Sequence, residues 1–150
     1  MKVLVIGKGG REHALAHAVS RSGRVKKIYA APGNPGMAEL AECVNIADSD
    51  VKGLTAFAKE QEIDLTIVGP EATLSLGIVD AFQAEGLKIF GPTKDAAQVE
   101  SSKDFAKKIM AKYGIPTASY QTFDNKADAI GYVEHQGVPI VIKEDGLKAG

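Results

Sequence analysis

A glycine-rich turn that carries an arginine and a glutamate is the part of this sequence best suited to chemistry. The apolar residues 3–6 lead directly into Gly7-Lys8-Gly9-Gly10-Arg11-Glu12, and a helical pattern follows. Turns of this kind bind anions, because free backbone N–H groups and the positive end of the helix dipole meet there and glycine has no Cβ to keep a phosphate away. Arg11 adds a planar set of donors suited to phosphate oxygens. The turn therefore predicts a ligand that carries a phosphate.

The same turn fits the dinucleotide-binding fingerprint poorly. Gly7 and Gly9 match the first two glycines of G-x-G-x-x-G, but Glu12 occupies the third position. A side chain there is expected to obstruct the close packing of helix on strand. The second predicted strand runs into Pro-Gly-Asn-Pro-Gly at 32–36, where an acid that binds a ribose diol is expected, and no Walker A spacing occurs. The pattern therefore disfavours a nicotinamide or flavin dinucleotide.

Composition excludes several other classes of protein. The 150 residues contain 45% hydrophobic and 25% charged residues, which is ordinary for a globular protein. Eighteen basic and nineteen acidic residues give a net charge of -1, so we expect no nucleic-acid partner. The apolar run at 3–6 is too short for a signal peptide, and no stretch approaches membrane-spanning length. The single cysteine, Cys43, suits a reducing compartment, so we expect a cytoplasmic protein without a membrane partner.

Short apolar runs alternate with amphipathic segments along the first hundred residues. This alternation predicts an α/β fold, a parallel sheet with helices on both faces. We expect strands near residues 2–6, 27–31, 43–46, 64–68 and 87–90, and helices near 11–22, 51–62, 73–85 and 94–113. Ligands bind at the carboxyl ends of the strands in such sheets, so the loops that follow these strands should form one pocket.

The pattern changes in the last third of the chain. Gly114-Ile115-Pro116 ends the long helix, and we expect a strand near 120–123, a helix near 126–136 and a strand near 139–143. We place a domain boundary between about residues 100 and 120, where the composition shifts. Because the chain stops at Gly150 inside a glycine-containing loop, we expect it to be a fragment of a longer protein.

Four further side chains have positions that suit ligand binding. Asn34 and Glu71 each follow a predicted strand; Glu71 is placed to accept from ribose hydroxyls, whereas Asn34 also suits turn geometry alone. Lys103 lies in line with an apolar helix stripe, so it either extends along that stripe or carries an ammonium into a pocket. Lys143 ends an apolar strand, which suggests an anionic partner.

Two other candidates have simpler interpretations. Glu12 either binds a hydroxyl or amine of the ligand or only complements the helix dipole. His13 and His17 share a helix face, but no acid or cysteine at ligand spacing completes a metal site, so we expect none within this chain.

A set of short motifs occurs in a fixed order along the whole chain. They are Gly9-Gly10-Arg11-Glu12-His13-Ala14, Ala31-Pro32-Gly33-Asn34, Ile67-Val68-Gly69-Pro70-Glu71-Ala72, Phe90-Gly91-Pro92, Ser102-Lys103-Asp104-Phe105, Pro116-Thr117-Ala118 and Ile140-Val141-Ile142-Lys143, continuing through Asp145-Gly146-Leu147 to Ala149-Gly150. This set resembles the amino-terminal part of the phosphoribosylamine–glycine ligase (glycinamide ribonucleotide synthetase) family, which belongs to the ATP-grasp superfamily.

The resemblance implies both an architecture and a reaction. It implies a Rossmann-like substrate domain over residues 1–100, then a linker helix and the start of a truncated ATP-grasp domain over 101–150. The implied ligase, an enzyme of purine biosynthesis, joins glycine to phosphoribosylamine with ATP through a glycyl phosphate, releasing ADP and phosphate. Positioning and charge neutralisation by lysines and Mg²⁺ (or Mn²⁺) carry most of the first step. The fragment alone is expected to be inactive, and a monomer is favoured.

The resemblance also implies roles for single residues. The residues implied to bind phosphoribosylamine are Gly9, Gly10, Arg11, Glu12, Asn34 and Glu71. Those implied to contact ATP are Lys103, Lys143 and Gly150, with 147–150 opening a glycine-rich lid. Catalytic residues, metal ligands and the glycine site are expected beyond Gly150, so none is assigned here.

The sequence departs from the family pattern at four positions, and two alternatives stay open. The departures are Lys8, Thr73, Glu144 and Lys148; those beside Asp145-Gly146-Leu147 leave the behaviour of the lid open. The first alternative is another ATP-grasp enzyme, such as a ribonucleotide carboxylase or formyl transferase, against which Arg11-Glu12-His13 argues. The second is a nucleotide-binding module without catalysis.

Overall fold

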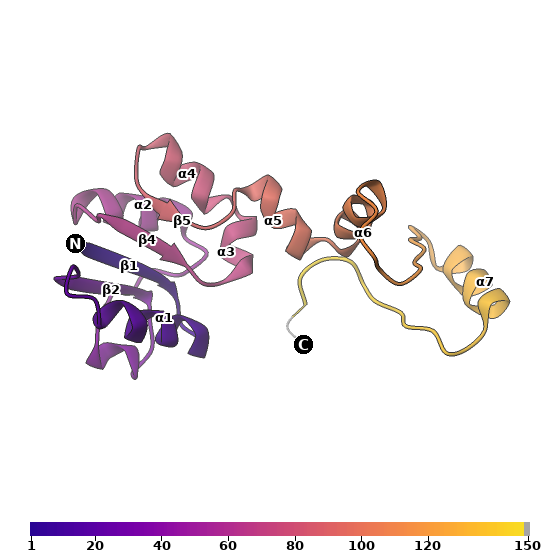
Figure 1. Cartoon of the computed structure of the whole chain (residues 1–150), viewed down its shortest axis with the longest axis horizontal. Helices are drawn as coiled ribbons and strands as arrows, with labels where there is room; N and C mark the ends of the chain where they lie inside the picture. The colour runs from indigo at the N-terminus through magenta and orange to yellow at the C-terminus, as the bar shows by residue number, and fades with distance from the viewer. Residues whose placement is uncertain (149–150) are drawn as a thin grey trace. The chain divides into compact units, whose positions relative to one another are not determined.

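The computed structural model describes residues 1–148, which divide into two compact units (Figure 1). The first unit is Met1–Ala97 and the second begins at Gln98, so the division falls inside helix α5 (Lys94–Ser101).

The first unit is an α/β domain built on a parallel sheet of five strands, as the sequence predicted. The strands are β1 (Lys2–Gly7), β2 (Lys27–Pro32), β3 (Glu42–Cys43), β4 (Leu65–Val68) and β5 (Ile89–Phe90). Their spatial order is β3-β2-β1-β4-β5, and every neighbouring pair is parallel. The helices are α1 (Gly10–Ser20), the 3₁₀ helix η1 (Met37–Glu39), α2 (Val51–Glu60), α3 (Glu71–Ser75), α4 (Ile78–Ala84) and the start of α5. β1 is central, so the turn that follows it lies in the middle of one sheet edge.

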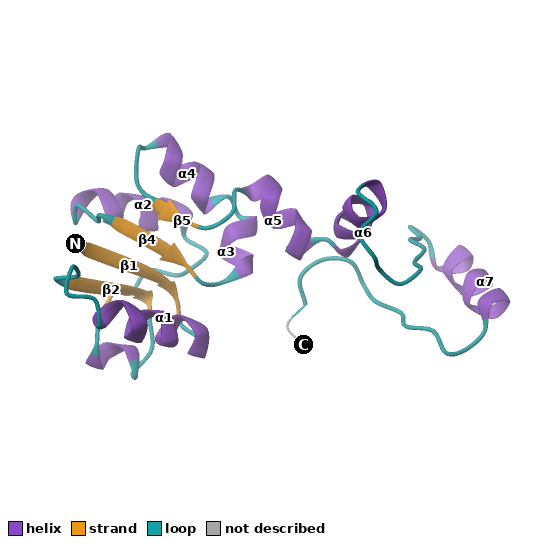
Figure 2. Cartoon of the chain, in the orientation of Figure 1, coloured by secondary structure: helices purple, strands orange, loops and turns teal. Residues whose placement is uncertain are grey.

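Side chains of the central strand alternate between two apolar layers. Val3 and Val5 pack with α1 and η1, whereas Leu4 and Ile6 pack with α2 and α4 on the opposite face. Figure 2 shows the strands with helices on both sides. Both layers are fully buried, which explains why β1 is a continuous apolar run rather than an alternating one.

Two of the predicted helices are interrupted. The helix expected at 73–85 is divided into α3 and α4 at Gly77, whose φ of 86° is left-handed and cannot continue an α-helix. The helix expected at 94–113 is divided into α5 and α6 (Lys103–Lys112) at Ser102, which is extended. The Ser102 hydroxyl accepts from the Phe105 N–H at 3.1 Å, so it caps the second helix.

The second unit contains α6 and α7 (Lys126–Gln136), the latter with the bounds predicted from sequence. The predictions of strands near 120–123 and 139–143 were wrong, because the described part of the chain offers these segments no partner strand. A strand forms only when its N–H and C=O groups pair with a neighbour. Val138, Val141 and Ile142 are accordingly 78% exposed or more.

Among residues 1–148, no helix combines the length and the apolar character needed to cross a membrane.

The core of the first unit gives a direct stability prediction. Phe82 is fully buried, so Phe82→Ala should lower the free energy of unfolding by about 3–5 kcal/mol through lost burial and a cavity. Phe90 is 71% exposed, so Phe90→Ala should change the free energy of unfolding by less than about 0.5 kcal/mol. Amide hydrogen exchange of residues 3–6 measures unfolding of this unit; equal effects of the two changes would contradict the assignment of the core.

Candidate functional site

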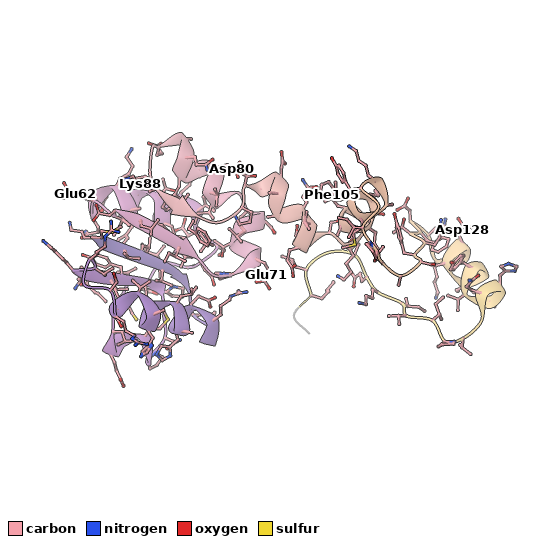
Figure 3. All side chains as sticks on the ribbon, in the orientation of Figure 1. Glu62, Glu71, Asp80, Lys88, Phe105 and Asp128 are labelled. Carbon is pink, nitrogen blue, oxygen red and sulfur yellow. The ribbon has the colours of Figure 1, made fainter. Side chains whose placement is uncertain are left out.

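Three loops meet at the carboxyl edge of the sheet in the first unit. They follow β1, β2 and β4 and carry Gly7–Glu12, Pro32–Gly36 and Gly69–Glu71. Figure 3 shows Glu71 beyond the carboxyl end of β4, whereas Glu62 and Lys88 lie at the opposite end of the sheet. The structure therefore brings together the strand-end residues that the sequence singled out in this unit.

Arg11 connects two of these loops through its guanidinium group. Its Nε donates to Glu12 Oε1 at 2.9 Å, and its Nη2 donates to Glu71 Oε2 at 3.0 Å. The arginine side chain stays 58% exposed. An arginine has five N–H donors, so donors remain for a ligand that arrives from solvent.

The Glu12 carboxyl group is buried and has hydrogen bonds on both oxygens. The residue is 3% exposed; Oε2 accepts from the Gly9 N–H at 2.7 Å, while Oε1 accepts from Arg11. The Gly9 bond is one half of a capping box, since Glu12 is the third residue of α1. The glutamate thus holds the backbone of the turn as well as the arginine.

Glycines on two loops make the room for this glutamate. A Cβ on Gly7 would lie 2.5 Å from Glu12 Cγ, and one on Gly9 would lie 2.9 Å from its Oε2. A Cβ on Gly69, at the end of β4, would collide with the Glu12 carboxyl group as well. We call these three residues the glycine cage. The expected obstruction by Glu12 is therefore absent, because glycines surround it.

Asn34 ties the loop after β2 to the loop after β1. Its Nδ2 donates to the Lys8 carbonyl at 2.9 Å, and its Oδ1 accepts from the Met37 N–H at 3.0 Å. The side chain is half-buried. These bonds serve the turn geometry and also fix Asn34 beside the glycine turn.

The first turn of α1 presents free backbone donors beside Arg11. The N–H groups of Gly10, Arg11 and Glu12 have no intrahelical acceptor, because the first bond within the helix runs from the His13 N–H to the Gly9 carbonyl at 3.0 Å. A Cβ added to Gly10 would meet no atom within 4 Å. The packing of the protein therefore does not require a glycine at position 10, and the space beside it is open to a ligand.

Electrostatics in this cluster keep both exposed partners charged. The hydrogen bond with Glu12, and after it that with Glu71, raises the pKa of Arg11 above its ordinary value. The hydrogen bond from its own backbone N–H, followed by that from Arg11, lowers the pKa of Glu71 below its ordinary 4.5. One guanidinium thus lies between two carboxyl groups.

In the second unit, Lys103 lies at the start of α6 and is joined to the segment 145–146. Its Nζ donates to the Gly146 carbonyl at 2.7 Å, and its N–H donates to Asp145 Oδ1 at 2.6 Å. Asp145 Oδ2 also accepts from the Ser102 hydroxyl at 3.0 Å. The Asp104 N–H, and to a lesser extent Ser102, lower the pKa of Asp145. The aspartate caps the helix beside the lysine.

Of the other residues predicted for this unit, one is described by the structure and one is not. Lys143 is exposed on a segment outside any helix or strand. Gly150 lies outside the described residues, so the expected ATP contact there has no structural description. Within residues 1–148, no group of three or more His, Cys, Asp or Glu side chains is arranged to hold a metal ion.

An open hollow of about 460 Å³ lies elsewhere in the first unit, at the start of β2. Lys27 of β2 and Glu42 of β3 line the hollow, and their side chains form an ion pair of 2.7 Å. The strand-end residues do not line this hollow, so it is not part of the candidate site.

Sequence reasoning missed two features of these clusters. The contribution of Gly69 to the glycine cage was not foreseen, although the glycine lies two residues before the candidate Glu71. The capping of α6 by Asp145 was also missed, because the residues lie about forty positions apart and no local pattern joins them.

Comparison with protein families gives two adjacent matches that together span the chain. Residues 1–100 match the model described as phosphoribosylglycinamide synthetase, N domain, and residues 101–150 match phosphoribosylglycinamide synthetase, ATP-grasp (A) domain. The chain is 57% identical to a phosphoribosylamine–glycine ligase of Ralstonia nicotianae and 56% identical to one of Caldanaerobacter subterraneus, over 150 residues in each case. All of this chain is covered, but only 36% of each relative, so the chain spans about a third of their length.

Solved structures show the same architecture. The crystal structure of phosphoribosylamine–glycine ligase from Thermotoga maritima is 29% identical, with a TM-score of 0.74 over 98% of this chain and 34% of that one. N5-carboxyaminoimidazole synthetase from Staphylococcus aureus, solved with ADP, is 18% identical, with a TM-score of 0.74 over 98% of this chain and 39% of that one. At that identity the second likeness concerns the fold alone.

The ion pair between Arg11 and Glu71 should contribute to the free energy of unfolding in a way that depends on pH. Because the pKa of Glu71 is lowered by folding, its contribution is present above pH 4.5 and is lost as pH falls through the folded pKa. The pair is about half exposed, so we expect at most about 1 kcal/mol. The difference in unfolding free energy between the unmodified chain and Glu71→Gln, measured by urea denaturation, should be largest near pH 7 and shrink below pH 4.5. A difference that grows on acidification would contradict this.

Proposed function

Because the chain belongs to the phosphoribosylglycinamide synthetase family, we propose that it is the amino-terminal part of a phosphoribosylamine–glycine ligase. The complete enzyme would join glycine to phosphoribosylamine in purine biosynthesis, with ATP converted to ADP and phosphate. The glycine carboxylate first attacks the terminal phosphate of ATP and gives a glycyl phosphate. The amine of the sugar then attacks the acyl carbon, and phosphate leaves.

The observation that supports this proposal best is the mixed charge of the strand-end cluster. Arg11 and the free N–H groups at the start of α1 favour an anion, whereas Glu71 repels one and accepts from O–H or N–H donors. A bare anion would satisfy only one half of this arrangement. A sugar phosphate with hydroxyls and an amine satisfies both.

The residues would divide the substrate between them. The backbone of Gly9 and Gly10 and the guanidinium of Arg11 would hold the phosphate. Glu71 would accept from the ribose hydroxyls or the amine, and Asn34 would hold the loop after β2 against the turn.

The second unit would serve the nucleotide. Lys103 and Lys143 would neutralise ATP phosphates, and the segment 147–150 would begin a lid that includes Gly150. The ligands of a Mg²⁺ or Mn²⁺ ion would come from outside this chain, and the ion would supply charge neutralisation at the ATP phosphates. Asp145 accepts from the Lys103 backbone N–H, and the Lys103 ammonium donates to the Gly146 carbonyl, which would keep the ammonium at the entrance of the lid segment.

The domain division follows the same proposal. Residues 1–100 would form the substrate domain and 101–150 the start of the ATP-grasp domain. We further propose a cytoplasmic enzyme with small-molecule substrates only, monomeric, and inactive as this piece alone.

Gly10→Ala tests the phosphate site without disturbing the fold. Since a Cβ at position 10 meets no protein atom, the variant should melt at the same temperature or slightly higher. The Cβ should obstruct a bound phosphate, so the dissociation constant for ribose 5-phosphate should rise by about tenfold or more in titration calorimetry. Gly23→Ala, also in open space, is the matched control and should bind as the unmodified chain does.

Two results would contradict the proposal. One is unchanged affinity of Gly10→Ala for ribose 5-phosphate. The other is equal affinity of the unmodified chain for inorganic phosphate and ribose 5-phosphate, because Glu71 should then contribute nothing to recognition of the sugar.

Lys103→Ala tests the nucleotide role in a full-length ligase that carries this segment. Loss of one charge-assisted contact should raise KM for ATP by about tenfold and leave KM for glycine nearly unchanged. Lys112→Ala is the control, because Lys112 is an exposed lysine on the same helix. Equal increases in both KM values would reject the assignment.

A further inference from the structure

Glu12 differs from the other strand-end residues because a ligand has no access to it. Its side chain is 4% exposed, whereas those of Arg11 and Glu71 are 58% and 46% exposed. Both of its oxygens accept bonds from within the protein, from Gly9 and Arg11. The glycine cage surrounds the rest of the carboxyl group. A direct hydrogen bond from Glu12 to a sugar would require the loss of one of these contacts.

We propose that Glu12 is a positioning residue, which orients the Arg11 guanidinium and the Gly9 amide and does not itself contact substrate. This inference rests on the proposed sugar-phosphate site and replaces the sequence-based expectation that Glu12 binds the ligand. Glu12 fixes the Nε side of the guanidinium, while Glu71 holds Nη2 near the surface. The remaining donors of Arg11 then have a defined direction before any ligand arrives.

The residue type at position 12 follows from this geometry. A glycine there would leave the cage empty and the Arg11 Nε without a partner. A glutamine has the same shape but carries only one acceptor oxygen, so its amide N–H₂ would face either the Gly9 N–H or the Arg11 Nε–H. Glu12→Gln therefore keeps the volume and removes one of the two bonds.

The first experiment needs no ligand. In the whole chain labelled with ¹⁵N at arginine, Nε–H exchange with water can be followed for the three arginines, Arg11, Arg21 and Arg24. Because the glutamine keeps one of the two bonds, we expect either the Arg11 Nε–H or the Gly9 N–H, followed in a second sample labelled with ¹⁵N at glycine, to exchange at least several-fold faster in Glu12→Gln than in the unmodified chain. The other two arginines should be unchanged. Unchanged rates at both groups would overturn the inference.

Glu71→Gln keeps the inference testable if Glu12→Gln does not fold. It removes the negative charge of the Nη2 partner but leaves the cage intact, so the Arg11 Nε–H should stay protected. If Glu71→Gln exposes the Nε–H, Glu12 alone does not hold the arginine and the inference fails.

The second experiment separates an indirect role from direct contact with ligand. Titration calorimetry with ribose 5-phosphate would compare Arg11→Ala, Glu12→Gln and the double variant. If Glu12 acts through Arg11, each single change weakens binding by about tenfold and the double variant is scarcely weaker than Arg11→Ala. Independent contacts would instead give about a hundredfold loss, the product of the single effects.

The outcomes distinguish this inference from the proposed function. Independent, multiplying losses reject the positioning role and keep the sugar-phosphate site. Failure of the unmodified chain to bind ribose 5-phosphate rejects the site, while the Nε–H exchange still decides whether Glu12 positions Arg11. Unchanged binding by a folded Glu12→Gln, with only a lower melting temperature, would show a purely structural role and overturn the inference. Glu85→Gln, which removes the negative charge of a surface partner of Lys59, is the control for loss of a carboxylate.

Discussion

Burial of one carboxyl group, that of Glu12, determines how the loops at the sheet edge meet. The group needs two donors because an unsatisfied buried carboxyl group is costly, and it finds them in the Gly9 amide and the Arg11 guanidinium. It also needs space, which Gly7 and Gly69 provide from the ends of β1 and β4. The glycines at this edge of the sheet therefore serve two purposes. Gly7, Gly9 and Gly69 accommodate a side chain, and only Gly10 is left open toward solvent.

The charges at this edge follow from the same arrangement. The buried Glu12 carboxylate partly neutralises the charge of the Arg11 guanidinium, and Glu71 adds a second carboxyl group at the surface. The cluster is thus not a general anion-binding site, despite the helix terminus beside it. It suits a ligand that brings one anion and several hydrogen-bond donors, which is the chemical character of a phosphorylated amino sugar. Many proteins with this architecture bind phosphate groups, and the fold alone does not select the ligand. The charges at the sheet edge are therefore needed to distinguish a sugar phosphate from a simple anion.

The sequence predicted the first unit better than the second, and the reason is the range of the interactions. Apolar runs and helix periodicity are local, so the parallel sheet and the meeting of loops at its carboxyl edge could be predicted. The breaks at Gly77 and Ser102 are also local, but single residues are weak signals within a long helical pattern. The failed strands near 120–123 and 139–143 depend on partner strands that their own residues do not specify. The place of Glu12 depends on Gly69, more than fifty residues away, so its fit could not be foreseen from the turn itself.

Ordering an arginine in advance has an energetic consequence for binding. A long side chain immobilised by a ligand costs roughly 0.5–1.5 kcal/mol of affinity in lost rotamer freedom. Here Glu12 orders the Nε end of Arg11 during folding, so that cost is met when the protein folds and the two hydrogen bonds of the Glu12 carboxyl group form. A glycine at position 12, as in the dinucleotide fingerprint, would allow closer packing of helix on strand but would leave the arginine mobile. Glutamate at this position thus exchanges close helix packing for a guanidinium with a fixed direction, which would benefit the proposed site for one phosphate and the sugar attached to it.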